Sequence, residues 1–184
     1  MDAFEEIVAG LFRHGKKKYW TWLNYKIKLT KQEKAEVGKP SMPRPEIDVL
    51  AYRPVDNELL WIECKSYLDS PGVRLDHFIG GTGFGGVPKV FVNDKYREIV
   101  THALRQQVVG DGLVQPDPLI RYCLVAGNIF GLSSEKLEGY QNFFEEHGWM
   151  LWGPIQIREH IHQLSRLGYE NDIAIITAKL LGKT

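Results

Sequence analysis

The sequence contains little cysteine, no long apolar run and no excess of either charge. Its two cysteines, Cys64 and Cys123, lie inside apolar segments and lack metal-ligand spacing. We therefore expect small buried thiols, which suit a reducing cytoplasm. No apolar stretch approaches the roughly 20 residues that cross a bilayer. Residues 1–6 are acidic and amphipathic, unlike a secretory signal. These absences predict a cytoplasmic protein without membrane association.

The charges of the whole chain balance, because 23 Lys and Arg residues face 23 Asp and Glu residues. A neutral chain is not expected to bind polyanions indiscriminately. The distribution is uneven, since residues 1–44 carry ten basic against five acidic side chains and residues 135–172 carry three against seven. The basic segment could contact phosphates while the acidic segment faces solvent or a protein partner. Two solvated surfaces of opposite sign explain the pattern equally well.

The composition is that of an ordinary globular protein, with 43% apolar and 25% charged residues among 184. This predicts one domain covering residues 1–184. Loops are expected at 31–45 and in the glycine-rich stretch Gly80–Gly86. Apolar periodicity and turn residues predict helices at 2–14, 94–109, 133–147, 155–167 and 170–181, and strands at 19–29, 47–52, 59–65, 119–126 and 149–152. The order predicts a mixed α/β domain.

Two neighbouring predicted strands carry acidic residues at the ends that should meet. Asp48 lies near the start of the first strand, and Glu63 lies near the end of the second, with the turn residues 54–57 between them. Adjacent ends of an antiparallel hairpin bring such side chains to one point. Lys65 follows Glu63 by two residues, so both side chains project from the same face.

Converging carboxylates and an ammonium group suit phosphodiester chemistry. Two carboxylates and a backbone carbonyl form a hard oxygen site for Mg²⁺, with Mn²⁺ as a substitute. The lysine can orient a water molecule or neutralise charge in a phosphoryl transition state. The alternative is a half-exposed hairpin in which Glu63 and Lys65 form a solvated pair, because an Asp followed by Glu-x-Lys also occurs by chance.

The pattern from Asp48 to Glu63-Cys64-Lys65 resembles the PD-(D/E)xK nuclease superfamily, which includes Mrr-type restriction enzymes and Holliday-junction resolvases. The resemblance implies a restriction-endonuclease-like three-layer fold, with a central mixed β-sheet flanked by helices, and DNA as substrate. It also implies that Asp48, Glu63 and the Cys64 carbonyl bind the metal and that Lys65 is the catalytic lysine. The chain departs from the pattern in one place, since Pro45 stands three residues before Asp48.

An acidic residue of the first predicted helix is a further candidate. The Phe4-Glu5 pair is similar to the Phe-Glu of Mrr-like first helices, which places an acid near the metal. Glu5 shares a helical face with Val8 and should point toward the sheet, whereas Glu6 turns toward solvent. We favour Glu5 as the catalytic residue. Either acid could instead stabilise the positive end of the helix dipole.

A basic segment follows that helix. Lys16, Lys17 and Lys18 precede aromatic residues in a mixture that suits a nucleic-acid backbone and unstacked bases. A solvated lysine cluster leading into a core strand is the alternative. Gln106 and Gln107 fall in the helix after the Glu-x-Lys strand, where related families carry a supporting glutamine, although an ordinary polar helix face is favoured here.

Two function classes remain from the sequence. The first is a Mg²⁺-dependent endodeoxyribonuclease, acting as a homodimer if it cuts both strands with one site per chain. The second is a catalytically silent nuclease-fold subunit that binds nucleic acid or serves as a protein scaffold. The complete set of Asp48, Glu63 and Lys65 favours the enzyme, since a chain without catalysis has no physical reason to retain converging carboxylates.

Overall fold

The computed structural model describes residues 2–38, 40–74, 76–79 and 86–182. Its strands are β1 (Trp20–Lys26), β2 (Glu46–Arg53), β3 (Glu58–Lys65), β4 (Leu119–Ala126) and β5 (Met150–Trp152). Its helices are α1 (Ala3–His14), α2 (Lys31–Glu36), the 3₁₀ turn η1 (Pro54–Asp56), α3 (Asp76–Ile79), α4 (Lys89–Val92), α5 (Asp94–Gly110), α6 (Ser134–Glu146), α7 (Pro154–Ser165) and α8 (Ile173–Leu181).

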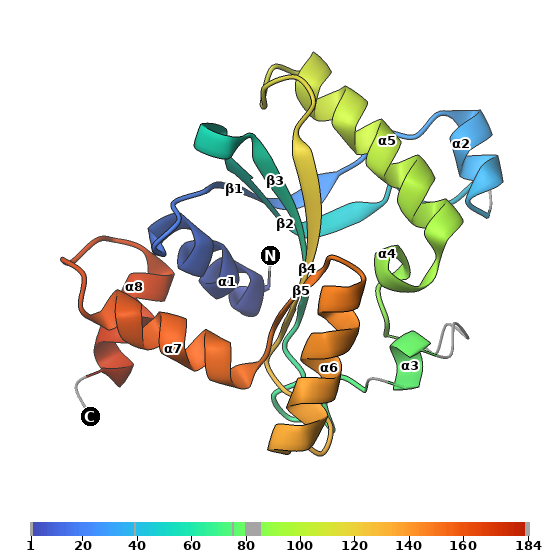
Figure 1. Cartoon of the computed structure of the whole chain (residues 1–184). Helices are drawn as coiled ribbons and strands as arrows, with labels where there is room; N and C mark the ends of the chain where they lie inside the picture. Colours follow the sequence, from blue (N-terminus) through green and yellow to red (C-terminus); the bar gives the residue numbers. More distant parts are fainter. Residues whose placement is uncertain (1, 39, 75, 80–85, 183–184) are drawn as a thin grey trace.

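The five strands form one mixed sheet in the order β1-β2-β3-β4-β5. The first three strands are an antiparallel meander, and β3, β4 and β5 run parallel to one another. Figure 1 shows α1, α7 and α8 on one side of this sheet and α3, α4, α5 and α6 on the other. The expected α/β class with a mixed sheet between helices is confirmed.

Successive side chains along the strands are buried alternately in two hydrophobic clusters, one on each face of the sheet. Leu59 and Trp61 of β3 belong to the cluster under α4, α5 and α6, whereas Leu60 and Ile62 belong to the cluster under α1, α7 and α8. This period of two is what a strand covered on both faces requires. Close packing of α1 on α8 depends on Gly10, because a Cβ there would collide with Ala174.

The turn between β2 and β3 fixes the register of the hairpin. Pro54 starts the 3₁₀ turn η1, and Asn57 ends it in the left-handed conformation at φ 50°, which asparagine tolerates better than most residues. The Tyr52 hydroxyl donates to the Asn57 side chain at 3.0 Å. The predicted antiparallel hairpin is confirmed, with Val49 opposite Ile62.

Some sequence-based predictions of local structure were wrong. The expected loop at 31–45 contains α2, because the Thr30 and Glu33 side chains cap the first turn of this helix reciprocally. The last helix begins at Ile173 rather than at residue 170, since Asp172 is its N-cap. The glycine-rich loop expected at 80–86 lies outside the described residues except for Gly86.

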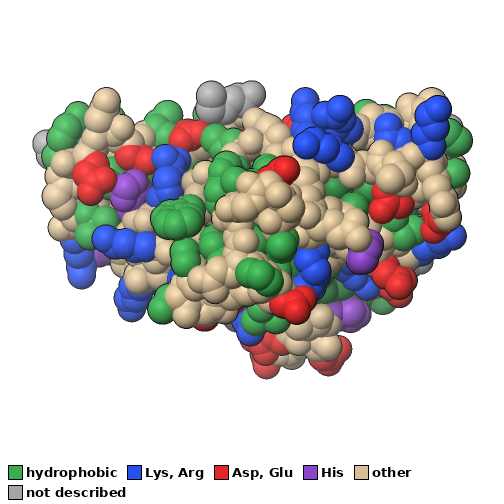
Figure 2. All heavy atoms as spheres, turned by 90° about the horizontal axis from the view of Figure 1, so that it is seen from above, with side chains coloured by type: hydrophobic (Ala, Val, Ile, Leu, Met, Phe, Trp, Pro, Cys, Tyr) green, Lys and Arg blue, Asp and Glu red, His purple; other side chains and the backbone are tan. Residues whose placement is uncertain are grey.

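The face of the molecule seen from above fits the balanced charge of the chain. Figure 2 shows basic and acidic side chains mixed with hydrophobic ones over the face seen from above. Both cysteines are buried thiols outside any disulfide, as expected. Across the ranges given above, none of the helices combines the length and the apolar character that crossing a bilayer requires.

Candidate active site

The two acidic strand ends meet where the hairpin stops pairing. The β2–β3 ladder ends at the Val49–Ile62 pair, so Asp48 and Glu63 follow just beyond it. The Asp48 carboxylate acts in place of a backbone carbonyl of β2, because it accepts a hydrogen bond from the Cys64 backbone N–H at 2.7 Å. The main chain of β3 therefore holds this carboxylate beside Glu63.

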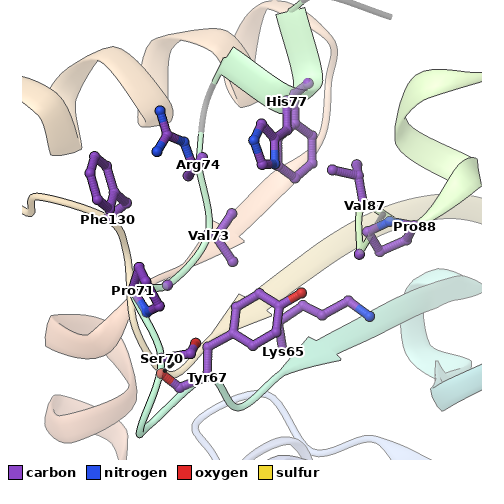
Figure 3. Close-up of a pocket in the computed structure, with 13 residues that line it drawn as sticks. Lys65, Tyr67, Ser70, Pro71, Val73, Arg74, His77, Val87, Pro88 and Phe130 are labelled. Atoms are coloured by element: carbon purple, nitrogen blue, oxygen red, sulfur yellow. Dashed lines mark hydrogen bonds between the residues drawn. The ribbon is translucent and has the colours of Figure 1, made fainter. Parts of the chain in front are cut away.

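Glu63 and Lys65 share the face of β3 that looks toward α5. The Glu63 carboxylate accepts a hydrogen bond from the indole N–H of Trp61 at 2.7 Å. This bond holds the Glu63 side chain on the face of β3 from which Trp61 projects. Lys65 follows on the same face by strand alternation. Its side chain lines a hollow of about 310 Å³ between β3 and the segments around α3 (Figure 3). The structure thus brings Asp48, Glu63 and Lys65 together.

The electrostatics of this cluster are unfavourable to two ionised carboxylates. Burial raises the pKa of Glu63 to about 8, and the charge of Asp48 contributes to this rise against the lowering effects of Trp61 and Lys65. The pKa of Asp48 is also raised, by burial and by the charge of Glu5, although the Cys64 N–H lowers it. The surrounding protein leaves negative charge here incompletely compensated, which is the condition that a bound cation relieves.

The structure separates Glu5 from Glu6. The charge of Glu5 raises the pKa of both Asp48 and Glu63, so its carboxylate lies near the cluster. It also accepts a hydrogen bond from the Asn24 amide of β1 at 3.0 Å. Glu5 is at the same time part of the capping box of α1 with Asp2, so its cap role and its place near the cluster coexist.

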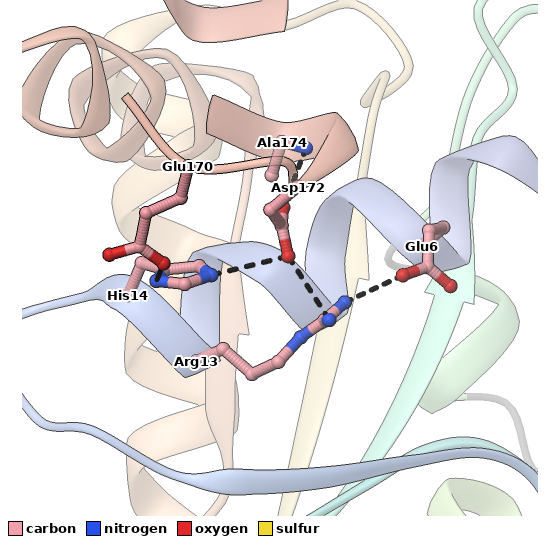
Figure 4. Close-up of polar contacts among 6 residues, drawn as sticks. All are labelled: Glu6, Arg13, His14, Glu170, Asp172 and Ala174. Carbon is pink, nitrogen blue, oxygen red and sulfur yellow. Dashed lines mark hydrogen bonds and ion pairs between the residues drawn. The ribbon is translucent and has the colours of Figure 1, made fainter. Parts of the chain in front are cut away.

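Glu6 belongs to a different network. Its carboxylate forms an ion pair with Arg13 at 2.6 Å, and Arg13 contacts Asp172 of the α8 N-cap at 3.0 Å (Figure 4). His14 contacts the same Asp172 and Glu170. Basic residues of α1 thereby meet acidic residues of the C-terminal segment within the molecule. Some charges of the basic N-terminal segment and the acidic C-terminal segment are therefore paired with each other and are not available to a partner.

Protein side chains supply only some of the ligands that a magnesium ion needs at this cluster. Within the described part of the chain, no three His, Cys, Asp or Glu side chains form a group that could hold a metal ion. Asp48 and Glu63 supply two carboxylates, and Mg²⁺ commonly completes its shell with water and substrate phosphate. The Cys64 side chain packs into the opposite cluster and burial raises the pKa of its thiol. Only the main chain of Cys64 can therefore contribute, as its carbonyl.

Lys16, Lys17 and Lys18 lie away from this cluster. They are exposed and precede the Trp20 end of β1, which pairs with Tyr52 of β2. Asp48 lies farther along β2, roughly 13 Å from Tyr52 at about 3.3 Å per residue. The structure therefore does not bring these lysines to the acidic cluster, and any phosphate that they contact is a different one.

Gln107 contacts the end of β1 that pairs with Glu46 and Ile47 at the start of β2. Its amide donates to the Tyr25 hydroxyl at 3.0 Å and to the Lys26 carbonyl at 3.2 Å, and its oxygen accepts from the Lys28 N–H at 2.8 Å. The side chain thus pairs with the edge strand as another peptide group would. It ties α5 to β1, so Gln107 has a structural role across the fold rather than a place on an ordinary polar helix face.

Three residues near the cluster were not singled out from the sequence. Trp61 donates to Glu63, Asn24 donates to Glu5, and the Tyr96 pKa is raised to about 12 by burial and by the charge of Glu63. Trp61 could have been found from its place two residues before Glu63, on the same strand face. Tyr96 could not, because its proximity depends on how α5 packs on the sheet.

Comparisons with known proteins add no relative to this picture. A scan against protein families, a search of curated proteins and a search of solved structures found no match for the chain. The assignment of a function therefore depends on the geometry and chemistry of the cluster itself.

Proposed function

We propose that the chain is a metal-dependent endonuclease that hydrolyses phosphodiester bonds of DNA. The observation that carries the proposal is the pair of carboxylates of Asp48 and Glu63, held side by side with Lys65 at the open end of the hairpin. Burial raises the pKa of both acids, and nearby carboxylates add to this rise: Glu5 at Asp48, and Asp48 at Glu63. Such uncompensated charge costs stability in a protein that does not use it.

The proposed roles follow from the chemistry of each group. Asp48, Glu63 and the Cys64 carbonyl would hold Mg²⁺, or Mn²⁺ in its place. When bound, this ion supplies positive charge for the phosphate and lowers the pKa of a coordinated water. The Lys65 ammonium would neutralise negative charge on the phosphate and orient the attacking water. Glu5 would add an acidic group at the border of the site, and Trp61 keeps Glu63 oriented.

The arrangement of the chain supports membership of the PD-(D/E)xK superfamily. The support is the order of the elements: an N-terminal helix, an antiparallel meander carrying the motif, and two parallel strands that each follow a helix. We assign the restriction-endonuclease-like fold on this basis. DNA as substrate and a homodimer for cutting both strands belong to the same proposal.

Cleavage assays on several DNA forms test the proposal. Purified protein is incubated with supercoiled plasmid, linear duplex and single-stranded DNA, with Mg²⁺, with Mn²⁺ and with EDTA. We expect cleavage in the presence of either metal alone, and a loss of at least about a hundredfold in Asp48→Asn and Lys65→Ala. Glu138→Gln, which changes an exposed acid on α6, is the matched control and should cut normally.

Metal binding is measured separately by calorimetry. We expect Mn²⁺ to bind the wild type and to bind Glu63→Gln at least about tenfold more weakly. Cleavage that survives both Asp48→Asn and Lys65→Ala would refute the proposal. Absence of cleavage together with absence of Glu63-dependent metal binding would favour the silent scaffold instead.

A further inference from the structure

The hollow beside Lys65 has the lining of a nucleotide site. It measures about 310 Å³, at the lower end of the range for small-molecule sites. Its lining includes the cationic or protonatable side chains of Lys65, Arg74 and His77 and the aromatic rings of Tyr67 and Phe130. No Asp or Glu occurs among the described residues that line it. In Figure 3, Lys65 and Tyr67 form the lower wall, Arg74 and His77 the upper wall.

The walls of the hollow are joined by hydrogen bonds. Beyond the ends of β3 and β4, the segments 66–74 and 127–130 pair with each other. The Val73 N–H donates to the Asn128 carbonyl at 3.0 Å, and the Phe130 N–H donates to the Val73 carbonyl at 2.9 Å. The Asn128 amide donates to the Ser70 carbonyl at 2.8 Å. The hollow is therefore preformed by the segments that follow β3 and β4, and β3 is the strand that carries Glu63 and Lys65.

Tyr67 is held in an unfavourable backbone conformation at the edge of the hollow. Its φ of 44° lies in the left-handed region, which a bulky residue rarely adopts. Gly86 makes room for it, because a Cβ at Gly86 would lie 2.7 Å from the Tyr67 hydroxyl. Strain of this kind persists where the surroundings fix a side chain in place, and here the ring of Tyr67 lines the hollow.

Arg74 is held at the upper wall of the hollow by two partners. Its guanidinium lies over the Phe130 ring, 4.3 Å from the ring centroid, and forms an ion pair with Asp76 at 3.0 Å. A guanidinium stacked in this way offers a plane on which an unstacked base can pack. Tyr67 offers an aromatic face for the same purpose.

We propose that this hollow binds one unpaired nucleotide of the DNA, next to the phosphate that is cut. The inference rests on the proposed nuclease function, since Lys65 lines the hollow and belongs to the catalytic cluster. A duplex, roughly 20 Å wide, cannot enter a space of this size, whereas a single base can. The preferred substrate class is therefore DNA that is single-stranded, or locally unpaired, at the cleavage point.

The first test compares substrates of one sequence. With Mn²⁺, the full chain should cut a single strand, or a duplex with an unpaired flap, at least about tenfold faster than the fully paired duplex. A single abasic position next to the cut should slow cleavage about tenfold, and an abasic position several nucleotides away should have little effect. Equal rates on paired and unpaired DNA, without any abasic effect, would overturn this inference and leave the nuclease proposal intact.

The second test does not depend on cleavage. Calorimetry without divalent metal measures binding of thymidine 5′-monophosphate and of inorganic phosphate. Tyr67→Asn keeps a residue that tolerates the left-handed backbone and removes the ring. We expect it to weaken nucleotide binding about five- to hundredfold, the range that base stacking supplies. Tyr169→Asn, at an exposed tyrosine after α7, is the matched control.

Three outcomes separate the two proposals. Nucleotide binding that depends on Tyr67, in a protein that cuts no DNA, would support the site and refute the nuclease. Inorganic phosphate binding as tightly as the nucleotide, with no effect of Tyr67→Asn, would identify a simple anion site and overturn the inference. Absence of binding to either probe would overturn it as well.

Discussion

Two glutamates of the same strand occupy opposite ends of β3 and have opposite surroundings. Glu58 is 5% exposed and accepts a hydrogen bond from the Tyr19 hydroxyl at 2.6 Å. Arg121 and Arg53 lie 3.5 Å and 3.7 Å from its carboxylate. Glu63 faces the charges of Asp48 and Glu5, with Lys65 as a nearby cation.

The difference shows which buried acid is structural. Buried charges are stable where cations and hydrogen bonds surround them, as at Glu58. At Glu63, burial and a like charge push the pKa to about 8, so the folded protein keeps an acid in an environment that disfavours its ionised form. An acid that the protein leaves uncompensated marks a site at which a cation is expected to bind.

The largest expected effect comes from exchanging each glutamate for glutamine. Glu63→Gln should reduce metal-dependent cleavage at least about a hundredfold. It should leave stability equal or higher, because it removes an acid whose ionised form the fold disfavours. Glu58→Gln should leave the cleavage rate of the folded protein unchanged. It should lower the free energy of unfolding by about 1–3 kcal/mol, because Arg53 and Tyr19 lose a charged partner.

Urea unfolding and a cleavage assay on the same preparations measure both effects. The comparison breaks if the two variants behave alike, either by both losing cleavage or by both losing stability. Circular dichroism checks that each variant keeps the native fold before its cleavage rate is compared.

The second prediction concerns pH. Burial raises the pKa of Glu63 from 4.5, its ordinary value, to about 8 in the folded chain. Between these values the folded state holds the additional proton, so raising the pH favours unfolding. We expect metal-free protein to lose stability from about pH 4.5 to pH 8, by an amount on the order of a few kcal/mol.

Chemical unfolding at a series of pH values, with and without Mg²⁺, measures this loss. Mg²⁺ should reduce the slope, because it stabilises the ionised carboxylates, and Glu63→Gln should flatten it. Glu138→Gln, at an exposed acid of α6, is the matched control and should retain the slope of the wild type. A metal-free wild type whose stability rises through this pH range would contradict the electrostatic description of the cluster.

The sequence predicted the hairpin and its acids because both depend on local patterns. Alternation places Glu63 and Lys65 on one face, and the turn at Pro54 makes the ends of β2 and β3 adjacent. The short helix α2 was not predicted, although Thr30 and Glu33 have the spacing of a capping box. The nearby prolines led to the prediction of a loop.

Contacts across the fold could not be predicted in the same way. The local sequence singles out Glu63 by its spacing to Lys65 but does not reveal the structural role of Glu58. Only the tertiary structure brings the Tyr19 hydroxyl to Glu58. The separation of Glu5 from Glu6 likewise depends on Arg13 reaching Glu6 and on Asn24 of β1 reaching Glu5.

A third prediction removes one hydrogen bond at each end of β3. Tyr19→Phe should lower the free energy of unfolding by about 1–2 kcal/mol, because Glu58 loses a donor at 2.6 Å. It should leave metal binding unchanged. Trp61→Phe removes the donor to Glu63 and should change Mn²⁺ affinity as well as stability, since the carboxylate is no longer oriented.

Unfolding curves and Mn²⁺ calorimetry on both variants provide the measurement. A change in Mn²⁺ affinity in Tyr19→Phe would mean that the two ends of β3 are coupled. An unchanged affinity in Trp61→Phe would mean that the Glu63 side chain needs no support from the indole.

The smallest effect is expected from the exposed lysines at the Glu58 end. Replacing Lys16, Lys17 and Lys18 by glutamine should weaken DNA binding less than about tenfold at physiological salt. In a plot of the logarithm of the binding constant against the logarithm of the salt concentration, the slope should become shallower. The change should be about one unit of slope for each phosphate that these side chains neutralise in the wild type. The cleavage rate at saturating DNA should not change, because these lysines precede the Trp20–Tyr52 end of the sheet, and Tyr52 lies roughly 13 Å along β2 from Asp48 of the acidic cluster.

Replacing Lys28, Lys31 and Lys34 by glutamine removes the same charge around α2 and is the matched control for a general loss of positive charge. If both triple variants change the salt dependence equally, Lys16–Lys18 are solvated surface charges and do not bind DNA. If only the first triple changes it, DNA extends from the cluster toward the Glu58 end. A lower cleavage rate at saturating DNA in the Lys16–Lys18 variant would show that the two ends of β3 do not act independently. The contrast between Glu58 and Glu63 would then describe two parts of one site.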